Sequence, residues 1–205
     1  MPARSSRLLW ISFVLSTTLT IFGTTGVALG ATLDVAGGQL MGAFGVDVGG
    51  TLYDVEFVEG TCPALFSGCD EASDFPFASQ AEAEVAAAAL GEQVFLDGPS
   101  GNFDSEPWLT NGCEDPHTCF VYIPVAVESV TNTAVVIFTN SIVNDDVDVY
   151  TRQITDDTSG WDFETWARWT PVPEPASGWL VGCGLVMAAT ARRRALNPPT
   201  RRRSR

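Results

Sequence analysis

The chain has 205 residues and a formal net charge of −14, with 25 Asp and Glu against 11 basic residues, all of them arginine. The 25 carboxylates all lie between Asp34 and Glu174, where Arg152 and Arg168 are the only basic residues, so residues 31–175 carry a charge of −23. Such a segment repels phosphate groups, which argues against nucleic acid or anionic lipid as a partner. Its length suits one domain.

The N-terminus has the pattern of a secretory signal peptide. Arg4 and Arg7 precede an apolar run over residues 8–27, and Ala28-Leu29-Gly30 puts small residues at the two positions that a signal peptidase inspects. We expect the general secretion machinery to export the chain and signal peptidase to remove residues 1–30. An uncleaved N-terminal anchor is the alternative.

Residues 31–171 predict one α+β domain, a mostly antiparallel β-sheet with one Ala-rich helix, preceded by the signal peptide and followed by a C-terminal transmembrane helix. Strands are expected over 40–47 and 51–58, joined as a hairpin at Gly49-Gly50. Residues 62–77 predict a loop. Ser79-Gln80-Ala81-Glu82 is a capping-box pattern and opens a helix that runs to about Leu96.

The second half of this domain predicts more strands. A loop over 98–118 precedes strands over 119–130, 133–143 and 146–154, of which Val135-Val136-Ile137-Phe138 is the most buried in character. After a turn at 156–160, an aromatic strand over 161–170 would complete the sheet.

Four cysteines predict two disulfides in an exported domain. Of the three possible pairings we favour the local ones, because each closes a turn-rich loop. By the chain-entropy estimate, each such disulfide would stabilise the fold by about 2–3 kcal/mol. The spacings do not fit the C-x2-C pattern of a zinc site. The favoured pairs are Cys62 with Cys69 and Cys113 with Cys119.

Residues 172–205 predict a membrane segment in three parts. Val172-Pro173-Glu174-Pro175 cannot be helical, because each proline fixes its own φ and disfavours helix at the residue before it. Residues 176–191, which include Cys183 as a small apolar residue, carry no charge and would span roughly 24 Å, against a hydrocarbon core of roughly 30 Å. A buried core helix is the alternative, but seven arginines follow within fourteen residues.

These arginines predict the orientation of the membrane segment. Arg192, Arg193 and Arg194 form a stop-transfer signal at the start of the tail 192–205. By the positive-inside rule they place that tail in the cytoplasm and the acidic domain outside.

The three parts, in this order at the C-terminus, resemble the PEP-CTERM sorting signal of Gram-negative bacteria. The resemblance covers about the last 34 residues, and the chain departs from the pattern by continuing from Ala195 to Arg205 after the first basic cluster. It implies that exosortase, a multi-pass membrane transpeptidase, cuts at or near the motif 172–175, in an organism that makes extracellular polysaccharide.

A second, weaker resemblance concerns the domain itself. Gly49 to Phe57, with Cys62 and Phe66 to Asp70, is similar to a module of exported PEP-CTERM proteins. This resemblance implies no catalytic residue.

Patterns of catalytic residues are few. His117 is the sole histidine, and a Ser-His-Asp site would have to combine it with Ser100, Ser105 or Ser129. None of these serines lies in a nucleophile-elbow context, so we expect His117 not to be catalytic. A phosphate-binding glycine loop with lysine is also missing from the sequence, which disfavours nucleotide chemistry.

Carboxylates and aromatic residues leave alternatives open. Paired carboxylates could serve a glycosidase or bind Ca²⁺, although no D-x-[DN]-x-[DN]-G loop is present and solvated loops are the favoured interpretation. The pairs are Asp104 with Glu106, Asp145 with Asp146 and Asp148, and Asp156 with Asp157. The aromatic cluster of Trp161, Phe163, Trp166 and Trp169 could stack on sugar rings, but core packing is favoured.

The sequence therefore favours an exported, non-enzymatic protein without a cofactor, and Ca²⁺ has no motif to support it. We expect it to be held transiently in the inner membrane, processed by exosortase, and delivered to the cell surface or extracellular matrix with exopolysaccharide as a partner. The alternative is a secreted, glycan-acting hydrolase that uses an Asp/Glu pair.

Overall fold

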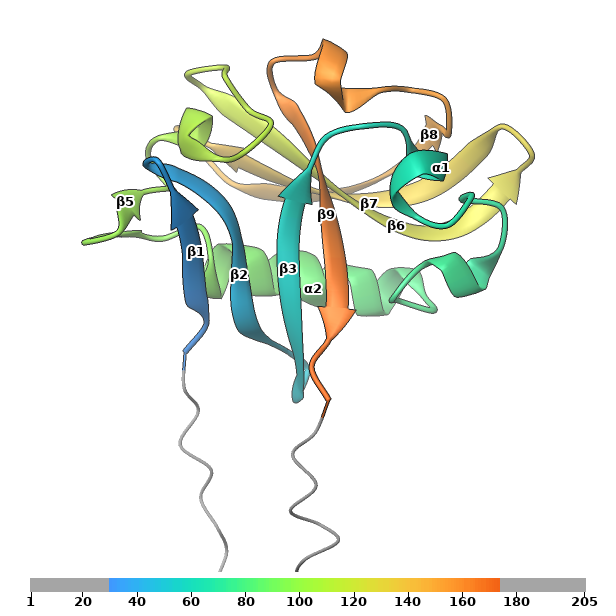
Figure 1. Cartoon of the computed structure of the whole chain (residues 1–205), viewed down its shortest axis with the longest axis horizontal. Coiled ribbons are helices and arrows are strands. Elements are labelled where there is room, and N and C mark those ends of the chain that lie inside the picture. Colours follow the sequence, from blue (N-terminus) through green and yellow to red (C-terminus); the bar gives the residue numbers. More distant parts are fainter. Residues whose placement is uncertain (1–29, 174–205) are drawn as a thin grey trace, which may run out of the picture.

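A computed structural model describes residues 30–173 of the chain. These residues form a seven-stranded sheet with one long helix across one face, which confirms the α+β class (Figure 1). Residues 1–29 of the expected signal peptide, the apolar segment 176–191 and the arginine tail lie outside the described residues. Within residues 30–173, no helix has both the length and the apolar character to cross a membrane.

The N-terminal half of the sheet is an antiparallel meander of β1 (Thr32–Ala36), β2 (Gln39–Val48) and β3 (Thr51–Val58). Gly49 and Gly50 join β2 to β3 with φ of 61° and 93°, so the predicted hairpin is confirmed. Strand β1 was not predicted from the sequence. This strand is short and half-exposed, and its pairing with β2 defines it more than its own pattern does.

The strand order is β1-β2-β3-β9-β6-β7-β8. The last strand, β9 (Glu164–Pro171), lies in the middle of the sheet, antiparallel to β3 and parallel to β6 (Thr118–Ser129). The strand expected over 161–170 forms at Glu164–Pro171, and it completes the sheet by joining its two halves. β7 (Asn132–Ser141) and β8 (Asp146–Gln153) continue the sheet as antiparallel strands.

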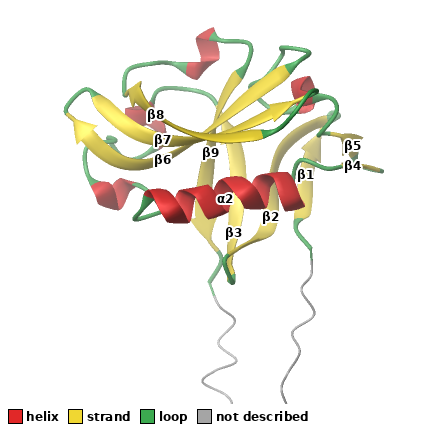
Figure 2. Ribbon diagram, turned by 180° about the vertical axis from the view of Figure 1, so that it is seen from behind, coloured by secondary structure: helices red, strands yellow, loops and turns green. Residues whose placement is uncertain are grey.

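Helix α2 (Gln80–Gln93) lies across one face of the sheet, against β2, β6 and β7 (Figure 2). Its predicted start is confirmed, because Ser79 Oγ accepts a hydrogen bond from the Glu82 N–H at 3.3 Å. The Glu82 carboxylate reaches one residue further back than a capping box requires, to the N–H of Ala78 at 2.8 Å. The helix ends near Gln93, slightly earlier than the expected Leu96.

Small side chains bring α2 close to the sheet. Ala83, Ala86 and Ala87 are fully buried, together with Leu90, whereas Val85 on the outer side is 46% exposed. This packing forms the larger core, with side chains from five strands. They include Val46, Phe57, Val121, Ile123, Val136, Phe138 and Trp169.

A smaller core covers part of the opposite face of the sheet. The segment expected to be a loop over 62–77 contains two short helices, α1 (Cys62–Leu65) and η1 (Ala72–Asp74). Their aromatic residues pack on β6, β7 and β9. The buried members are Cys62, Phe66, Cys69, Phe75, Tyr122, Val135, Ile137 and Trp166.

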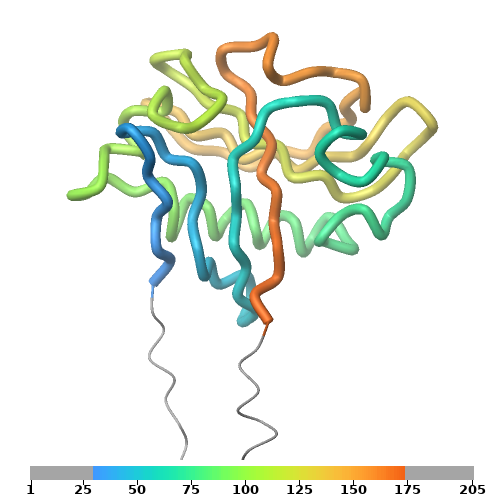
Figure 3. Tube along the Cα trace, viewed as in Figure 1, coloured from blue at the N-terminus to red at the C-terminus, as the bar shows by residue number. Residues whose placement is uncertain are grey.

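The remaining elements are short and occupy the expected loop regions. β4 (Asp97–Gly98) pairs with β5 (Gly101–Asn102), η2 spans Pro107–Leu109, and η3 spans Thr158–Gly160. The chain enters β1 and leaves β9 at the same end of the domain, beside the β2–β3 turn (Figure 1, Figure 3).

Candidate functional site

The end of the domain where the chain enters and leaves is the first candidate site. The N–H of Val172 donates to the carbonyl of Leu52 at 2.9 Å, so β9 stays attached to β3 up to the first residue of the expected sorting motif. Pro173 is the last described residue, and Glu174, Pro175 and Arg192 to Arg194 lie outside the described residues. The motif thus follows the sheet without a linker.

The two disulfides stabilise loops that meet the sheet. Cys62 is bonded to Cys69 and Cys113 to Cys119, which are the local pairings favoured from the sequence. All four cysteines are buried, and each bridge belongs to a different core, one on each face of the sheet.

The second candidate site is an open groove of about 750 Å³ over the second face of β6, β7 and β8. Side chains alternate along a strand, so every second residue of β8 faces this groove. Opposite them on β7 lie Val135, Ile137 and Thr139. The groove is lined by Phe120, Tyr122, Val135, Ile137, Thr139, Ser141, Asn144, Asp146, Asp148, Tyr150, Thr151, Arg152, Gln153 and Asp156.

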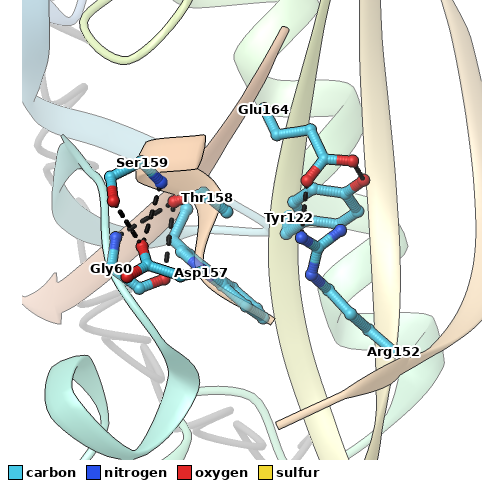
Figure 4. A network of polar contacts seen from close by, with 8 residues as sticks. Gly60, Tyr122, Arg152, Asp157, Thr158, Ser159 and Glu164 are labelled. Carbon is cyan, nitrogen blue, oxygen red and sulfur yellow. Dashed lines mark hydrogen bonds and ion pairs between the residues drawn. The ribbon is translucent and has the colours of Figure 1, made fainter. Parts of the chain in front are cut away.

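An ion pair between β8 and β9, which are separated in the sheet by β6 and β7, forms one end of the groove. Arg152 Nη2 lies 2.5 Å from Glu164 Oε2, and each side chain is only 11% exposed (Figure 4). The hydroxyl of Tyr122 donates to the other oxygen of Glu164 at 2.8 Å. The guanidinium also stacks on two rings, 4.2 Å from the centroid of Tyr122 and 5.7 Å from that of Trp166.

Burial governs the protonation of this cluster. Burial raises the pKa of Tyr122, and the hydrogen bond that its hydroxyl donates to Glu164 raises the pKa further. Burial is the largest single influence on the pKa of Arg152 and would lower it, but the hydrogen bond to Glu164 and the charges of the surrounding groups together raise it more, so the net direction is upward. Tyr122 is therefore a neutral donor, and Arg152 is a cation whose charge is matched by Glu164.

A second network fixes the chain segment that precedes β9. The Gly60 N–H donates a hydrogen bond to Thr158 Oγ1 at 3.0 Å (Figure 4). The indole N–H of Trp166 donates to the Gly60 carbonyl, also at 3.0 Å. Asp157 accepts hydrogen bonds from the N–H and hydroxyl of Ser159. These contacts hold the segment after β8 against the end of β3.

The rim of the groove is acidic. Asp146, Asp148 and Asp156 line it, and among the described residues neither Asp148 nor Asp156 has a side-chain hydrogen bond. Among the described residues that line the groove, Arg152 is the one cation, and Glu164 neutralises it. The open part of the groove is therefore negative, and it combines carboxylate acceptors with aromatic surface.

The candidate Ser-His-Asp residues do not meet. His117 is exposed, its backbone N–H donates to Asp115, and within residues 30–173 no hydrogen bond joins its side chain to Ser100, Ser105 or Ser129. This arrangement provides no nucleophile and base pair at His117.

The paired carboxylates separate into different surroundings. Burial raises the pKa of Asp145, and the nearby charge of Asp104 raises it further. A hydrogen bond from the Ser141 N–H acts in the opposite direction and lowers it, but the net pKa is raised. Asp146 and Asp148 line the groove, whereas Asp157 is not part of its lining and accepts hydrogen bonds from Ser159 in η3. Among the described residues, no group of three His, Cys, Asp or Glu side chains is arranged to hold a metal ion.

The predicted aromatic cluster is divided by the sheet. Trp166 and Trp169 are both buried but belong to opposite cores, because they are an odd number of residues apart on β9. Trp161 is 53% exposed, and its ring lies 5.8 Å from that of Phe163. Core packing, the favoured interpretation, therefore applies to two of the four residues.

The cluster of Tyr122, Arg152 and Glu164 was not predicted from the sequence. Tyr122 and Glu164 are distant in the sequence and meet only because β6 and β9 are parallel neighbours. The one available signal was Arg152 itself, one of two basic residues in an acidic domain. Comparison of the chain with protein-family models, curated proteins and solved structures gave no match.

Proposed function

We propose that the protein is an exported, non-enzymatic protein of the cell surface or extracellular matrix. In this proposal exosortase processes its C-terminus at or near residues 172–175 after transient insertion of residues 176–191 in the inner membrane, and the released domain associates with exopolysaccharide.

The observation that carries the proposal is the position of the two ends of the domain. Residue 30 and residue 173 leave at the same end of the domain, and Val172 still pairs with Leu52 there (Figure 1). A domain with this arrangement can stand on a membrane with the N-terminal and C-terminal apolar segments entering side by side. Arginines flank each apolar segment on the side away from the domain. By the positive-inside rule, both arginine-flanked ends lie in the cytoplasm and the domain lies on the other side of the membrane.

Two further features agree with this proposal. The two disulfides suit an oxidising compartment outside the cytoplasm. The acidic surface favours solubility after release and disfavours adhesion to anionic lipid.

The intact mass of the mature protein tests the processing step. A host with exosortase should yield a chain that lacks residues 1–30 and most or all of residues 176–205. A host without exosortase should retain the C-terminal segment in the membrane fraction. Residues 176–205 still attached in the normal host would overturn the proposal.

One observation favours the alternative, a glycan-acting hydrolase. Burial raises the pKa of Asp145 and the charge of Asp104 raises it further, and glycosidases use a carboxylic acid of raised pKa together with a second carboxylate. Asp145→Asn would abolish release of sugars from a susceptible polysaccharide under this alternative, whereas Asp97→Asn would not. Unchanged turnover in Asp145→Asn would exclude Asp145 as the acid.

A further inference from the structure

We propose that the groove over β6, β7 and β8 binds a short segment of non-anionic glycan, with sugar rings against its aromatic surface and hydroxyl or amino groups at its carboxylates. This inference rests on the proposed function for the source of the ligand, the exopolysaccharide. The ligand class is inferred from the shape, the aromatic and polar side chains, and the charge of the groove.

The volume and shape of the groove suit such a ligand. At about 750 Å³ it lies within the range of roughly 300–1,000 Å³ that ligand sites occupy. The apolar part of its floor is the partly buried ring of Phe120 with a small exposed area of Ile137, and its rim is polar along β8. A sugar ring has the same division, since its faces carry C–H groups and its edges carry hydroxyl groups.

Aromatic side chains provide surfaces for sugar rings. Tyr150 points into the groove and is 59% exposed, so one face of its ring is available to a ligand. Phe120, also in the groove, lies 5.8 Å from Phe163, and Phe163 lies 5.8 Å from the exposed Trp161. This row of rings leads from the groove to the surface, as a chain of sugars would require.

Polar side chains provide partners for hydroxyl groups. The free carboxylates of Asp148 and Asp156 accept hydrogen bonds, and the amides of Asn144 and Gln153 both donate and accept. A planar carboxylate or amide can contact two neighbouring hydroxyls of one ring.

Charge decides which glycans fit. Asp146, Asp148 and Asp156 are acidic, and Glu164 already neutralises Arg152, so the potential in the open groove is negative. Uronate, sulfate and phosphate groups would be repelled. Uncharged sugars are accepted, and amino sugars gain an attraction to the same carboxylates.

Calorimetric titration of the full chain in mild detergent tests the inference. The probes are neutral gluco-oligosaccharides, glucosamine oligomers, mannuronate oligomers and calcium chloride. We expect saturable binding of the first two and none of the mannuronate oligomers. Tyr150→Ala should weaken binding about tenfold through loss of a stacked ring, and Asp148→Asn should weaken the glucosamine oligomers more than the neutral ones.

Matched variants outside the groove serve as controls. Phe44 is an exposed aromatic residue on β2, 53% exposed, and Glu92 is an exposed carboxylate on α2. Phe44→Ala and Glu92→Gln should bind as the unchanged chain does. Preference for mannuronate, binding of calcium without any sugar, an equal loss in Phe44→Ala, or no saturable binding would each overturn the inference.

The two proposals can fail separately. A chain that is processed normally but binds no oligosaccharide overturns the groove assignment and leaves the sorting proposal standing. A chain that binds glucosamine oligomers but keeps residues 176–205 in the normal host overturns the sorting proposal and leaves the groove assignment standing.

Discussion

Arg152 and Glu164 form an ion pair at 2.5 Å between β8 and the start of β9, under the ring of Tyr122 and close to Trp166. These two residues come from strands that are not neighbours, since β6 and β7 lie between β9 and β8. The pair therefore bridges the second face of the sheet and closes one end of the groove.

Glu164→Gln should lower the free energy of unfolding by about 3 kcal/mol, because it leaves the buried guanidinium of Arg152 without a counter-charge. Urea unfolding followed by tryptophan fluorescence measures this. The control is Glu56→Gln, since the pair between Glu56 and Arg168 at 2.6 Å has side chains 57% and 43% exposed. That change should cost under about 1 kcal/mol, and equal losses would contradict the importance of burial.

Asp145 and Asp97 should respond to pH in opposite directions. Burial is the main cause that raises the pKa of Asp145 above its ordinary value of 3.8. The ionised carboxylate therefore destabilises the folded chain at pH values above the folded-state pKa. Below pH 3.8 the carboxyl is protonated in both states, and this destabilisation is absent. Asp145→Asn should therefore raise the free energy of unfolding at neutral pH, and the gain should vanish in acid.

The pKa of Asp97 is lowered below 3.8, chiefly by hydrogen bonds from the N–H and hydroxyl of Ser105. Its ionised form stabilises the folded chain above 3.8, and this contribution is lost as pH falls through the folded-state pKa. Asp97→Asn should thus be destabilising at neutral pH and near neutral in acid. Urea titrations of both variants at each pH check the pair, and shifts of the same sign would refute the assignment.

Gly42→Ala should destabilise the sheet between β2 and β3. A Cβ at this position would lie 2.1 Å from the carbonyl oxygen of Val55, which belongs to the backbone and cannot turn away. The loss should be about 3 kcal/mol or more, at the upper end for overpacking. Gly98→Ala is the control, because nothing lies within 4 Å of its Cβ and its φ is not positive. Thermal unfolding of both variants distinguishes a steric cause from a general effect of replacing glycine.

Removal of one disulfide should loosen one face of the sheet more than the other. Replacement of Cys62 and Cys69 by alanine should cost about 2–3 kcal/mol and increase quenching of tryptophan fluorescence, because Phe66 in that loop packs on Trp166 at 5.6 Å. Replacement of Cys113 and Cys119 should cost a similar amount with less effect on Trp166. Unaltered quenching in the first variant would show that the covering segment does not depend on its bridge.

Local chemistry was sufficient to predict much of this protein. The glycine pair at residues 49–50, the cap at Ser79 and the alternation of the later strands are set by short-range preferences, so the hairpin, the helix and the strands over 119–154 follow from the sequence. Local spacing also favoured the disulfide pairings that the structure contains. The expected sorting signal is likewise a linear pattern, which residues 172–205 alone predict.

The tertiary structure decided what depends on residues far apart in the chain. The position of β9 between β3 and β6 brings Glu164 to Tyr122, separates Trp166 from Trp169, and brings both ends of the domain together. No local preference selects that position, because hydrogen bonding of a strand in the middle of a sheet depends on both neighbours. The groove, its buried ion pair and its acidic rim exist only once those long-range pairings have formed.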